Sequence, residues 1–474
     1  MLYQKVYNLT MDNGREVVAK VPLPHESMPH LTCASQVASM DFARSVLQLP
    51  APNVLAWSSH SHVQENPVGA EYVLVDKFPG VALESVWDDL SPASIHKLME
   101  QLAGYQDNLL SRTFRQIGAI YYADQAGPTS TGPLVYTDGD GKEIQDTRFT
   151  VGPVINLNWV KSDRRKLECD RGPWNSTMDF LHAIVYRELE AVEKAEQVPV
   201  SASFEILLGR VGYRPTKAKK RRVGEWYLKV LKHIAPLGSP IDRFRFWHNR
   251  IGMDTIFVDA RDNSKIVGLT GWDHSQVAPM FKQDVWPKLS DWAANMDEVD
   301  GDDDEELVVR SEEGTGARNF ERLCRNHSAS KKLLLLQESS EALEAKRFQQ
   351  CKFGSRIKWA EEIFDDAEAY SAWAFWLMRT RWRKYMPHVP RRKAAYPIKI
   401  SRRLERNLCR DLQRWRDGAD LMDMVSSRLD RMPIYDHAPV CAEDYKKTAR
   451  KLRKLKKEFV AKGLVYEDTW PFDA

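Results

Sequence analysis

Apolar and polar residues alternate in two short stretches near the start of the chain. Residues 5–10 and 16–21 change polarity at almost every position, as the strands of a half-buried sheet do. Between them lies Asp12-Asn13-Gly14, and Asn and Gly adopt the positive φ angles of a tight hairpin at little cost. Residues 71–77 form a third apolar stretch, which the turn Pro79-Gly80 ends. We therefore expect a small N-terminal sheet.

Helical periodicity appears between and after these strands. Apolar residues recur at helical spacing over 32–47, and Pro50 follows as a stop signal. Residues 91–110 form a second predicted helix, with Ser91 at the N-cap and Pro92 in the first turn. A third helix is predicted over 177–196.

Shorter strands fill much of the remaining chain up to about residue 290. Residues 118–157 predict short strands and turns, and 256–258 with 266–269 predict a hairpin closed by the polar turn 261–264. A small sheet-rich lobe followed by a helical lobe is an α+β layout. The predicted divisions are an N-terminal lobe at 1–80, a helical lobe at 81–296, an acidic linker at 297–316 and a helical, basic C-terminal region at 317–474.

Composition narrows the class of protein. The 474 residues are 43% hydrophobic and 10% aromatic, which is enough for a sizeable core. The net charge of +3 does not by itself argue for a nucleic-acid or membrane partner. No run of about 18 apolar residues predicts a membrane span. The N-terminal residues resemble neither a signal peptide nor a transit peptide.

The six cysteines are far apart and form no C-x-x-C pair, which favours reduced thiols in an intracellular compartment. Cys324 and His327 form an isolated C-x-x-H, but a zinc site needs about four ligands. We therefore expect neither a disulfide framework nor a zinc site.

Five segments, in order, carry a resemblance to a known family. They are KVYNLTMDNGREVVAKVP, CASQVASMDFARSVLQLPAPNVLAWS, ENPVGAEYVLVDKFPG, CDRGPW and FWHNRIGMDTIFVD with IVGLTGWDHSQVAP. Together they span about residues 3–290 and resemble the fungal branch of the aminoglycoside-phosphotransferase family, which includes proteins linked to mitochondrial inheritance. The resemblance implies a protein-kinase-like two-lobe fold, here with a truncated N-lobe and a helical C-terminal extension.

The family's catalytic loop reads His, any residue, Asp, four residues, Asn, and this chain departs from it. His248 holds the first position, but Arg250 stands where the Asp is expected and Thr255 where the Asn is expected. Gly271 replaces the Asp of the later Asp-Trp pair. The flanking residues agree with the family on both sides, which favours true loss over misalignment.

Two further positions belong to the nucleotide-binding part of the family pattern. Lys20 occupies the third-strand position that steadies the nucleotide phosphates, and Gln36 sits where the partner Glu on the next helix is expected. The family's first strand and glycine-rich loop have no counterpart, so we expect either a truncated sequence or a pocket open on one side.

These substitutions predict a pseudokinase. Phosphoryl transfer relies on positioning and charge neutralisation, and Arg250 stays protonated and cannot act as the base. Thr255 and Gly271 remove both expected Mg²⁺ ligands. Lys20 and an arginine would still hold a phosphate, giving binding without efficient turnover.

Two carboxylates offer an alternative metal site. Asp254 and Asp273 lie close in sequence to the lost ligands, and we interpret them as ordinary turn or surface acids. If extended, the segment would point Asp273 to the same side as Gly271. His248 is expected to hydrogen-bond the backbone near the loop. ATP and magnesium enter as cofactors only if activity remains.

Basic residues concentrate at 217–222, 379–384, 391–393 and 446–457. The favoured interpretation is solvated helix faces balanced by acids elsewhere, since a nucleic-acid or anionic-membrane contact needs the charges gathered on one face. Nucleic acid is therefore the less favoured partner, open only through the basic C-terminal helices.

Three function classes remain: a pseudokinase acting as a binding or regulatory module, a divergent ATP-dependent small-molecule phosphotransferase using Asp254 or Asp273, and a basic adaptor for an acidic partner. The partner, a protein or a small molecule, stays unnamed by the sequence. The expected location is the cytoplasm, and a mitochondrial one rests on the family association alone.

Overall fold

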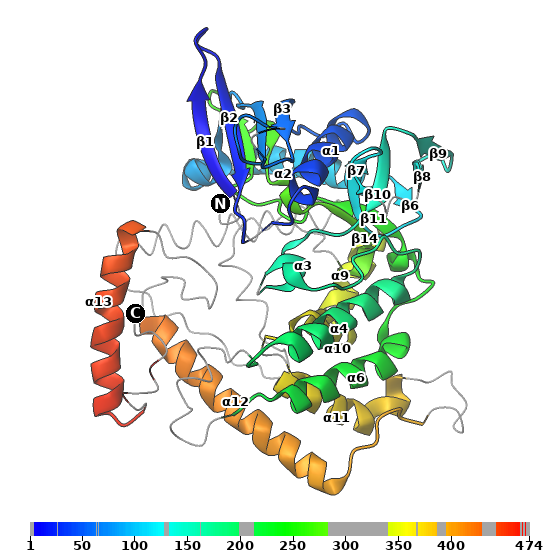
Figure 1. Ribbon diagram of the computed structural model, residues 1–474, viewed down its shortest axis with the longest axis vertical. Coiled ribbons are helices and arrows are strands. Elements are labelled where there is room, and N and C mark those ends of the chain that lie inside the picture. Colours follow the sequence, from blue (N-terminus) through cyan, green and yellow to red (C-terminus); the bar gives the residue numbers. More distant parts are fainter. Residues whose placement is uncertain are drawn as a thin grey trace.

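A computed structural model gives the fold of the chain (Figure 1). It describes residues 4–25, 27–62, 64, 66–127, 132–161, 163–198, 213–282, 340–365, 368–385, 395–428, 442–464, 467 and 470. The predicted acidic linker at 297–316, the Cys324–His327 pair and the basic run at 391–393 lie outside the described residues.

The N-terminal sheet has four strands in the order β1-β2-β4-β3. Their bounds are Gln4–Thr10, Glu16–Pro22, Tyr72–Asp76 and Val54–Ser58 respectively. Strands β1 and β2 pair antiparallel from Gln4 opposite Pro22 to Thr10 opposite Glu16. Gly14 closes their hairpin with a φ of 79°. The predicted hairpin and the predicted third strand are confirmed.

Helix α1 (Leu31–Ser45) packs against β3 and against strands of the central region. As a result, eleven of its fifteen residues are buried. Phe42 lies at the centre of an aromatic cluster, with ring centroids of Phe114, Tyr136, Phe149 and Phe246 between 5.5 and 5.9 Å away. This cluster joins α1 to the strands of the central region, so the helix is held by both.

The central region is built from short strands and one long helix. Helix α2 (Pro92–Leu110) begins as predicted, since the Ser91 hydroxyl accepts a hydrogen bond from the Ser94 N–H at 3.1 Å. Strand β5 (Gly80–Ala82) pairs with the predicted hairpin, β12 (Ile256–Asp259) and β13 (Ile266–Leu269).

The other central strands form a two-stranded sheet and a five-stranded sheet with the order β14-β11-β6-β8-β9. Their bounds are β6 Thr113–Phe114, β7 Ala119–Tyr122, β8 Leu134–Thr137, β9 Glu143–Asp146, β10 Phe149–Gly152, β11 Phe244–Trp247 and β14 Gln276–Pro279.

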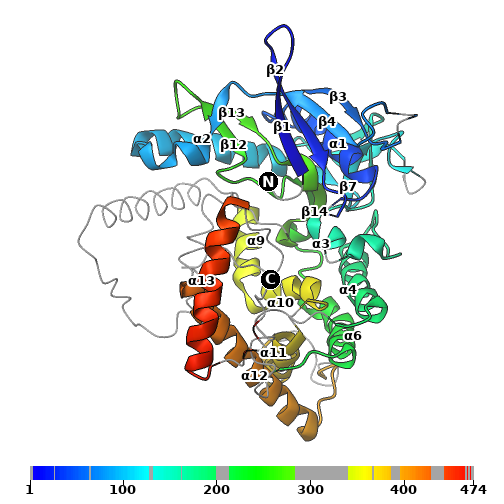
Figure 2. The same cartoon turned by 60° about the vertical axis from the view of Figure 1, so that its left-hand side comes forward.

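A helical lobe lies below these sheets in both views (Figures 1 and 2). Its core is shared by α4 and α6 with helices from beyond residue 340. The bounds are α3 Leu157–Val160, α4 Thr177–Lys194, α6 Lys217–Ile234, α9 Ser340–Gln350, α10 Lys352–Trp359, α11 Glu368–Tyr385, α12 Arg402–Arg428 and α13 Ala442–Ala461.

Buried charges tie the segment after α10 to α4 and α6. The Glu188 carboxylate accepts hydrogen bonds from Arg164 Nε at 2.8 Å and from the Phe364 N–H at 3.0 Å. Lys220 Nζ on α6 lies 2.9 Å from Glu368 Oε2. These carboxylates are almost fully buried, so the chain beyond residue 340 completes this lobe electrostatically as well as by packing.

The α+β fold class is confirmed, and the predicted third helix ends at Lys194, two residues early. Within the residues that the structure describes, no helix is both long and apolar enough to cross a membrane. The division into four regions stays a prediction.

Candidate functional site

The loop between β11 and β12 places His248 in the interior. Its Nδ1 accepts a hydrogen bond from the Arg250 N–H at 3.2 Å, and its ring meets the Trp272 ring edge-on at 4.3 Å. Burial lowers the pKa of His248 to about 4, so the imidazole is neutral at pH 7. The expected backbone hydrogen bond of His248 is confirmed.

The Arg250 side chain turns to an acid of its own loop. Its Nη2 lies 2.9 Å from Asp254 Oδ2, and the Asp254 side chain is 49% exposed. Asp254 is therefore a surface acid, as interpreted from the sequence, and its carboxylate pairs with the arginine that aligns with the expected catalytic Asp.

Thr255 is fully buried and closes the same loop. Its hydroxyl accepts a hydrogen bond from the Gly252 N–H at 2.9 Å and donates to the Arg250 carbonyl oxygen at 2.8 Å. Since the hydroxyl serves as both acceptor and donor within the loop, it acts there as a structural tie.

Gly271 faces these residues from the turn after β13. A Cβ atom added to it would lie 3.0 Å from Thr255 Cγ2, 3.4 Å from His248 Cε1 and 3.6 Å from Arg250 Cδ. Its φ of 89° also belongs to the region that favours glycine. The four positions that the sequence aligns with the catalytic motifs thus come together, and the glycine fits a site with little room for a side chain.

Asp273 lies in the short 3₁₀ turn Trp272–His274 and is only 3% exposed. Its Oδ1 accepts a hydrogen bond from Gln4 Nε2 at 3.4 Å, and its Oδ2 lies 3.4 Å from His274 Nε2. Asp273 lies in a turn, as one part of the sequence interpretation has it, but it is not at the surface. The segment is not extended, because the turn folds the chain back and carries the carboxylate inside.

The charges around Asp273 keep it ionised. Burial by itself raises the pKa of the Asp273 carboxyl, but the neighbouring His274, Lys20 and Arg250 outweigh burial and hold the pKa below its ordinary value. A single buried carboxylate therefore faces several basic side chains.

Lys20 projects from β2 and is 2% exposed. Its Nζ has no hydrogen-bond partner among the described residues. Burial lowers the pKa of Lys20, the Asp273 carboxylate opposes this shift, and Arg250 adds to it. An ammonium group left without a hydrogen bond in the interior is costly, and such groups are usually completed by a ligand or water.

Gln36 is also buried, on α1, the helix that packs against the turn holding Asp273. Neither its amide nitrogen nor its amide oxygen finds a partner among the described residues, so no hydrogen bond joins it to Lys20. The Ser39 hydroxyl, one turn further along α1, also has no hydrogen-bond partner among the described residues. Both elements that carry the predicted nucleotide-binding residues thus hold unpaired polar atoms.

Sequence reasoning missed Gln4. It is buried at the start of β1 and donates to Asp273, 269 positions away in the chain. No motif marks it, because its role depends on the sheet bringing the first described residue beside the turn after β13.

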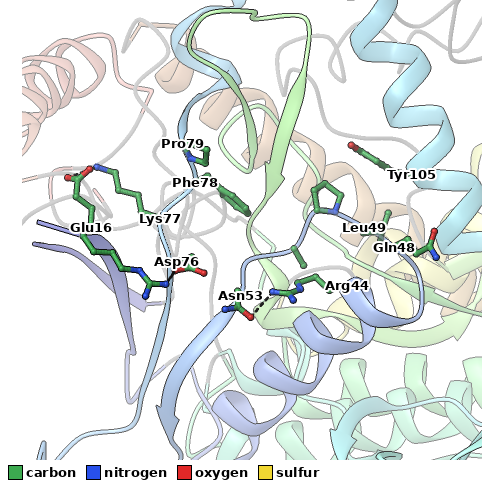
Figure 3. A pocket seen from close by; sticks show the side chains of 13 residues that line it. Glu16, Arg44, Gln48, Leu49, Asn53, Asp76, Lys77, Phe78, Pro79 and Tyr105 are labelled. Atoms are coloured by element: carbon green, nitrogen blue, oxygen red, sulfur yellow. Dashed lines mark hydrogen bonds and ion pairs between the residues drawn. The ribbon is translucent and has the colours of Figure 1, made fainter. Parts of the chain in front are cut away.

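A separate groove of about 740 Å³ lies on another part of the small lobe (Figure 3). Its charged residues are engaged with one another: Arg15 with Asp76 at 2.5 Å, and Lys77 with Glu16 at 2.9 Å. Arg44 donates to the Asn53 amide oxygen at 2.7 Å. Because these groups are already paired, the groove lacks the unpaired polar atoms found around Lys20.

The described part of the chain holds no cluster of side chains suited to bind a divalent metal. No group of three or more His, Cys, Asp or Glu side chains with metal-binding geometry occurs among the residues that the structure covers. Asp273 is the one acid beside His248 in the contacts described above.

Comparison with known proteins gives distant fungal relatives. No family model matches the chain. A subtelomeric hrmA-associated cluster protein of Aspergillus fumigatus is 28% identical over 317 residues, covering 60% of this chain and 58% of its own. The mitochondrial protein called altered inheritance of mitochondria protein 9, from Candida tropicalis, is 31% identical over 203 residues, 40% of this chain and 32% of its own. The chain is similar to this fungal group.

The predicted resemblance to the fungal branch is therefore confirmed by sequence. The chain spans little more than half the length of the Aspergillus relative and about a third of the Candida one.

Solved structures show distant similarity. The aminoglycoside phosphotransferase APH(4)-Ia with ADP and hygromycin B matches 78% of this chain and 90% of its own, with 13% identity and a TM-score of 0.32. A fructosamine-3-kinase described as putative, from Thermobifida fusca, matches 79% and 88%, with 9% identity and a TM-score of 0.36.

Proposed function

We propose that the protein is a pseudokinase-like binding module that holds a phosphate-bearing ligand at Lys20 without a divalent metal and does not transfer the phosphoryl group efficiently. The observation that carries the proposal is the buried Lys20 ammonium, which has no hydrogen-bond partner among the described residues. A phosphate oxygen is a strong acceptor for such a group.

The arrangement around the degenerate catalytic loop supports binding over turnover. A general base must accept a proton from the substrate hydroxyl, but Arg250 stays protonated and is paired with Asp254. The low pKa of the buried His248 leaves a neutral imidazole, but its Nδ1 is already occupied by the Arg250 N–H. Without a base and with a single buried carboxylate, transfer lacks its usual components.

A second candidate is a divergent ATP-dependent phosphotransferase, and Asp273 favours it. This carboxylate is buried, ionised and close to Lys20, which are properties of a metal ligand. In that case ATP and Mg²⁺ would be its cofactors, with Asp273 as the protein's main metal ligand. A small molecule would be the phosphoryl acceptor.

The deciding experiment is a thermal-shift and calorimetric titration of the full chain with ATP, in EDTA and in excess Mg²⁺. Equal stabilisation in both conditions, with no ADP formed, is the expected result. Lys20→Ala should remove the stabilisation, whereas Lys97→Ala, an exposed lysine on α2, should leave it unchanged.

The alternatives give different results. Stabilisation and ADP production that both require Mg²⁺, and that both disappear in Asp273→Asn, establish the phosphotransferase. Absence of any shift with ATP in either condition overturns the ligand part of the proposal.

For the compartment we propose the cytoplasm, with mitochondria as the alternative that the names of the Candida relatives suggest. Imaging of the full chain with a C-terminal fluorescent tag and a mitochondrial marker separates the two.

A further inference from the structure

Helix α13 (Ala442–Ala461) has an apolar side that is already covered. Leu455 and Phe459 are buried, and the Phe459 ring meets the Trp470 ring at 6.1 Å. Glu458 is paired with Arg428 at the end of α12, at 2.9 Å. The helix is thus fixed to the protein by one side, and it stands at the left edge of the described elements in Figure 1.

The other side of α13 carries only cations over three turns. Six of them are exposed and have no ion pair or hydrogen bond with another described residue: Lys446, Lys447, Arg450, Arg453, Lys454 and Lys457. Lys446, Arg450, Arg453 and Lys457 are spaced by four, three and four residues, so they lie on one face of the helix. This face is about 17 Å long at the helical rise per residue.

The basic run at the start of α6 is different, because three of its cations form ion pairs with acids of other helices. Lys219 Nζ lies 3.0 Å from Asp411 Oδ2 of α12, Lys220 is buried against Glu368, and Arg221 Nη2 lies 2.6 Å from Glu193 Oε1. The expected balance by acids elsewhere is observed for this run, but Lys220 is buried rather than solvated. The α13 face is exposed, and its charges are gathered as a contact with a polyanion requires.

Like charges at helical spacing repel one another, so a face of this kind gains most from a partner with closely spaced negative charges. A membrane-surface helix would place its apolar side among the lipids, but Leu455 and Phe459 are turned into the protein. Among the α13 side chains that the structure describes, no aromatic ring is exposed beside these cations to stack on single-stranded bases. We propose that the α13 face binds the phosphate backbone of duplex nucleic acid, without sequence specificity.

The proposal makes a quantitative prediction of salt dependence. Each phosphate neutralised by a lysine or arginine contributes about 0.9 to the slope of log affinity against log salt concentration. Contacts from four to six cations give a slope of about −4 to −5. Because the proposal does not involve Lys20, binding of duplex and binding of ATP are independent.

The test uses the full chain and fluorescence anisotropy with labelled 20-base-pair DNA and RNA duplexes at 50 to 200 mM NaCl. The variant Lys446→Gln, Arg450→Gln, Arg453→Gln, Lys457→Gln should lose at least about tenfold in affinity at 50 mM NaCl, and its slope should fall by about 3 to 4. The matched control, Lys97→Gln, Lys142→Gln, Lys265→Gln, Lys352→Gln, changes the same net charge at exposed sites elsewhere.

Retention of affinity and slope in the control variant, with loss in the α13 variant, supports the proposal. A preference between the DNA and RNA duplexes identifies the source of the phosphates. Equal losses in both variants, or no duplex binding at 50 mM NaCl, overturn it. Binding to vesicles of 30% phosphatidylserine that excess duplex does not displace assigns the face to a membrane and also overturns it.

Discussion

Arg250 and Asp254, four residues apart in one loop, form an ion pair with 2.9 Å between Nη2 and Oδ2. In the resemblance drawn from the sequence, this arginine aligns with the expected catalytic acid. Its charge is balanced within its own loop by a nearby surface acid.

Removal of the Asp254 charge should release Arg250 for a ligand. Because Asp254 is half-exposed, Asp254→Asn should lower the free energy of unfolding by less than about 1 kcal/mol. The affinity for ATP in EDTA should rise by about two- to fivefold, since the carboxylate paired directly with the arginine no longer competes with the ligand. Calorimetry on the variant measures this change, and an unchanged or weaker affinity would show that Arg250 does not contact the ligand.

His248 should make stability depend on pH. Its pKa is about 4 in the folded protein and about 6.5 when unfolded, so the unfolded state binds more protons between these values and stability falls as pH falls through them. From pH 7.5 to pH 5 this group should cost about 2 kcal/mol. His248→Asn removes that contribution.

Urea denaturation of the native chain and of His248→Asn at both pH values measures the effect. The stability advantage of the native chain should shrink by about 2 kcal/mol at the lower pH. An advantage that is the same at both pH values contradicts a neutral, buried imidazole.

Gly271 should resist substitution more strongly than a glycine with the same backbone conformation in open space. Gly271→Ala adds a positive-φ penalty of about 1 kcal/mol and a contact of 3.0 Å with Thr255 Cγ2. Gly14→Ala, at a φ of 79° with nothing within 4 Å of the added Cβ, carries the φ penalty alone. The difference between the two variants in denaturation experiments therefore measures the crowding, and equal losses would show that the site has room for a side chain.

Glu188 should be among the least replaceable carboxylates. It is fully buried and accepts hydrogen bonds from Arg164, Arg187 and the Phe364 N–H. Glu188→Gln removes the ion-pair partner of the buried Arg187 and one of the two carboxylates paired with the buried Arg164, which keeps Asp365 at 3.0 Å. A loss of about 3 to 5 kcal/mol is expected. Glu190→Gln, two residues further along, breaks an exposed pair with Lys194 and should cost less than about 1 kcal/mol.

Local sequence signals predicted the elements that depend on local chemistry. The hairpin at Asp12-Asn13-Gly14 and the N-cap at Ser91 follow from turn and cap preferences, and the structure has both. The convergence of His248, Arg250, Thr255 and Gly271 followed from the family resemblance and is also observed.

The burial of Asp273 was not predictable from its neighbours in sequence. A 3₁₀ turn carries the carboxylate inside, and its partner Gln4 lies 269 positions away in the chain. The particular acids that pair with the cations at the start of α6 were not predictable for the same reason, since they lie on α4, α11 and α12.

The buried ion pairs between α4 and the segment after α10 bear on how the chain responds to a protease. A cut anywhere between residues 283 and 339 would separate the polypeptide into two pieces, but the Phe364 N–H and Glu368 would still hold the second piece to Glu188 and Lys220. The nicked protein should therefore migrate as one species on a sizing column and as two bands in a denaturing gel. Expression of residues 1–282 alone should yield insoluble material, because Glu188 and Lys220 would lose the partners that the later residues supply.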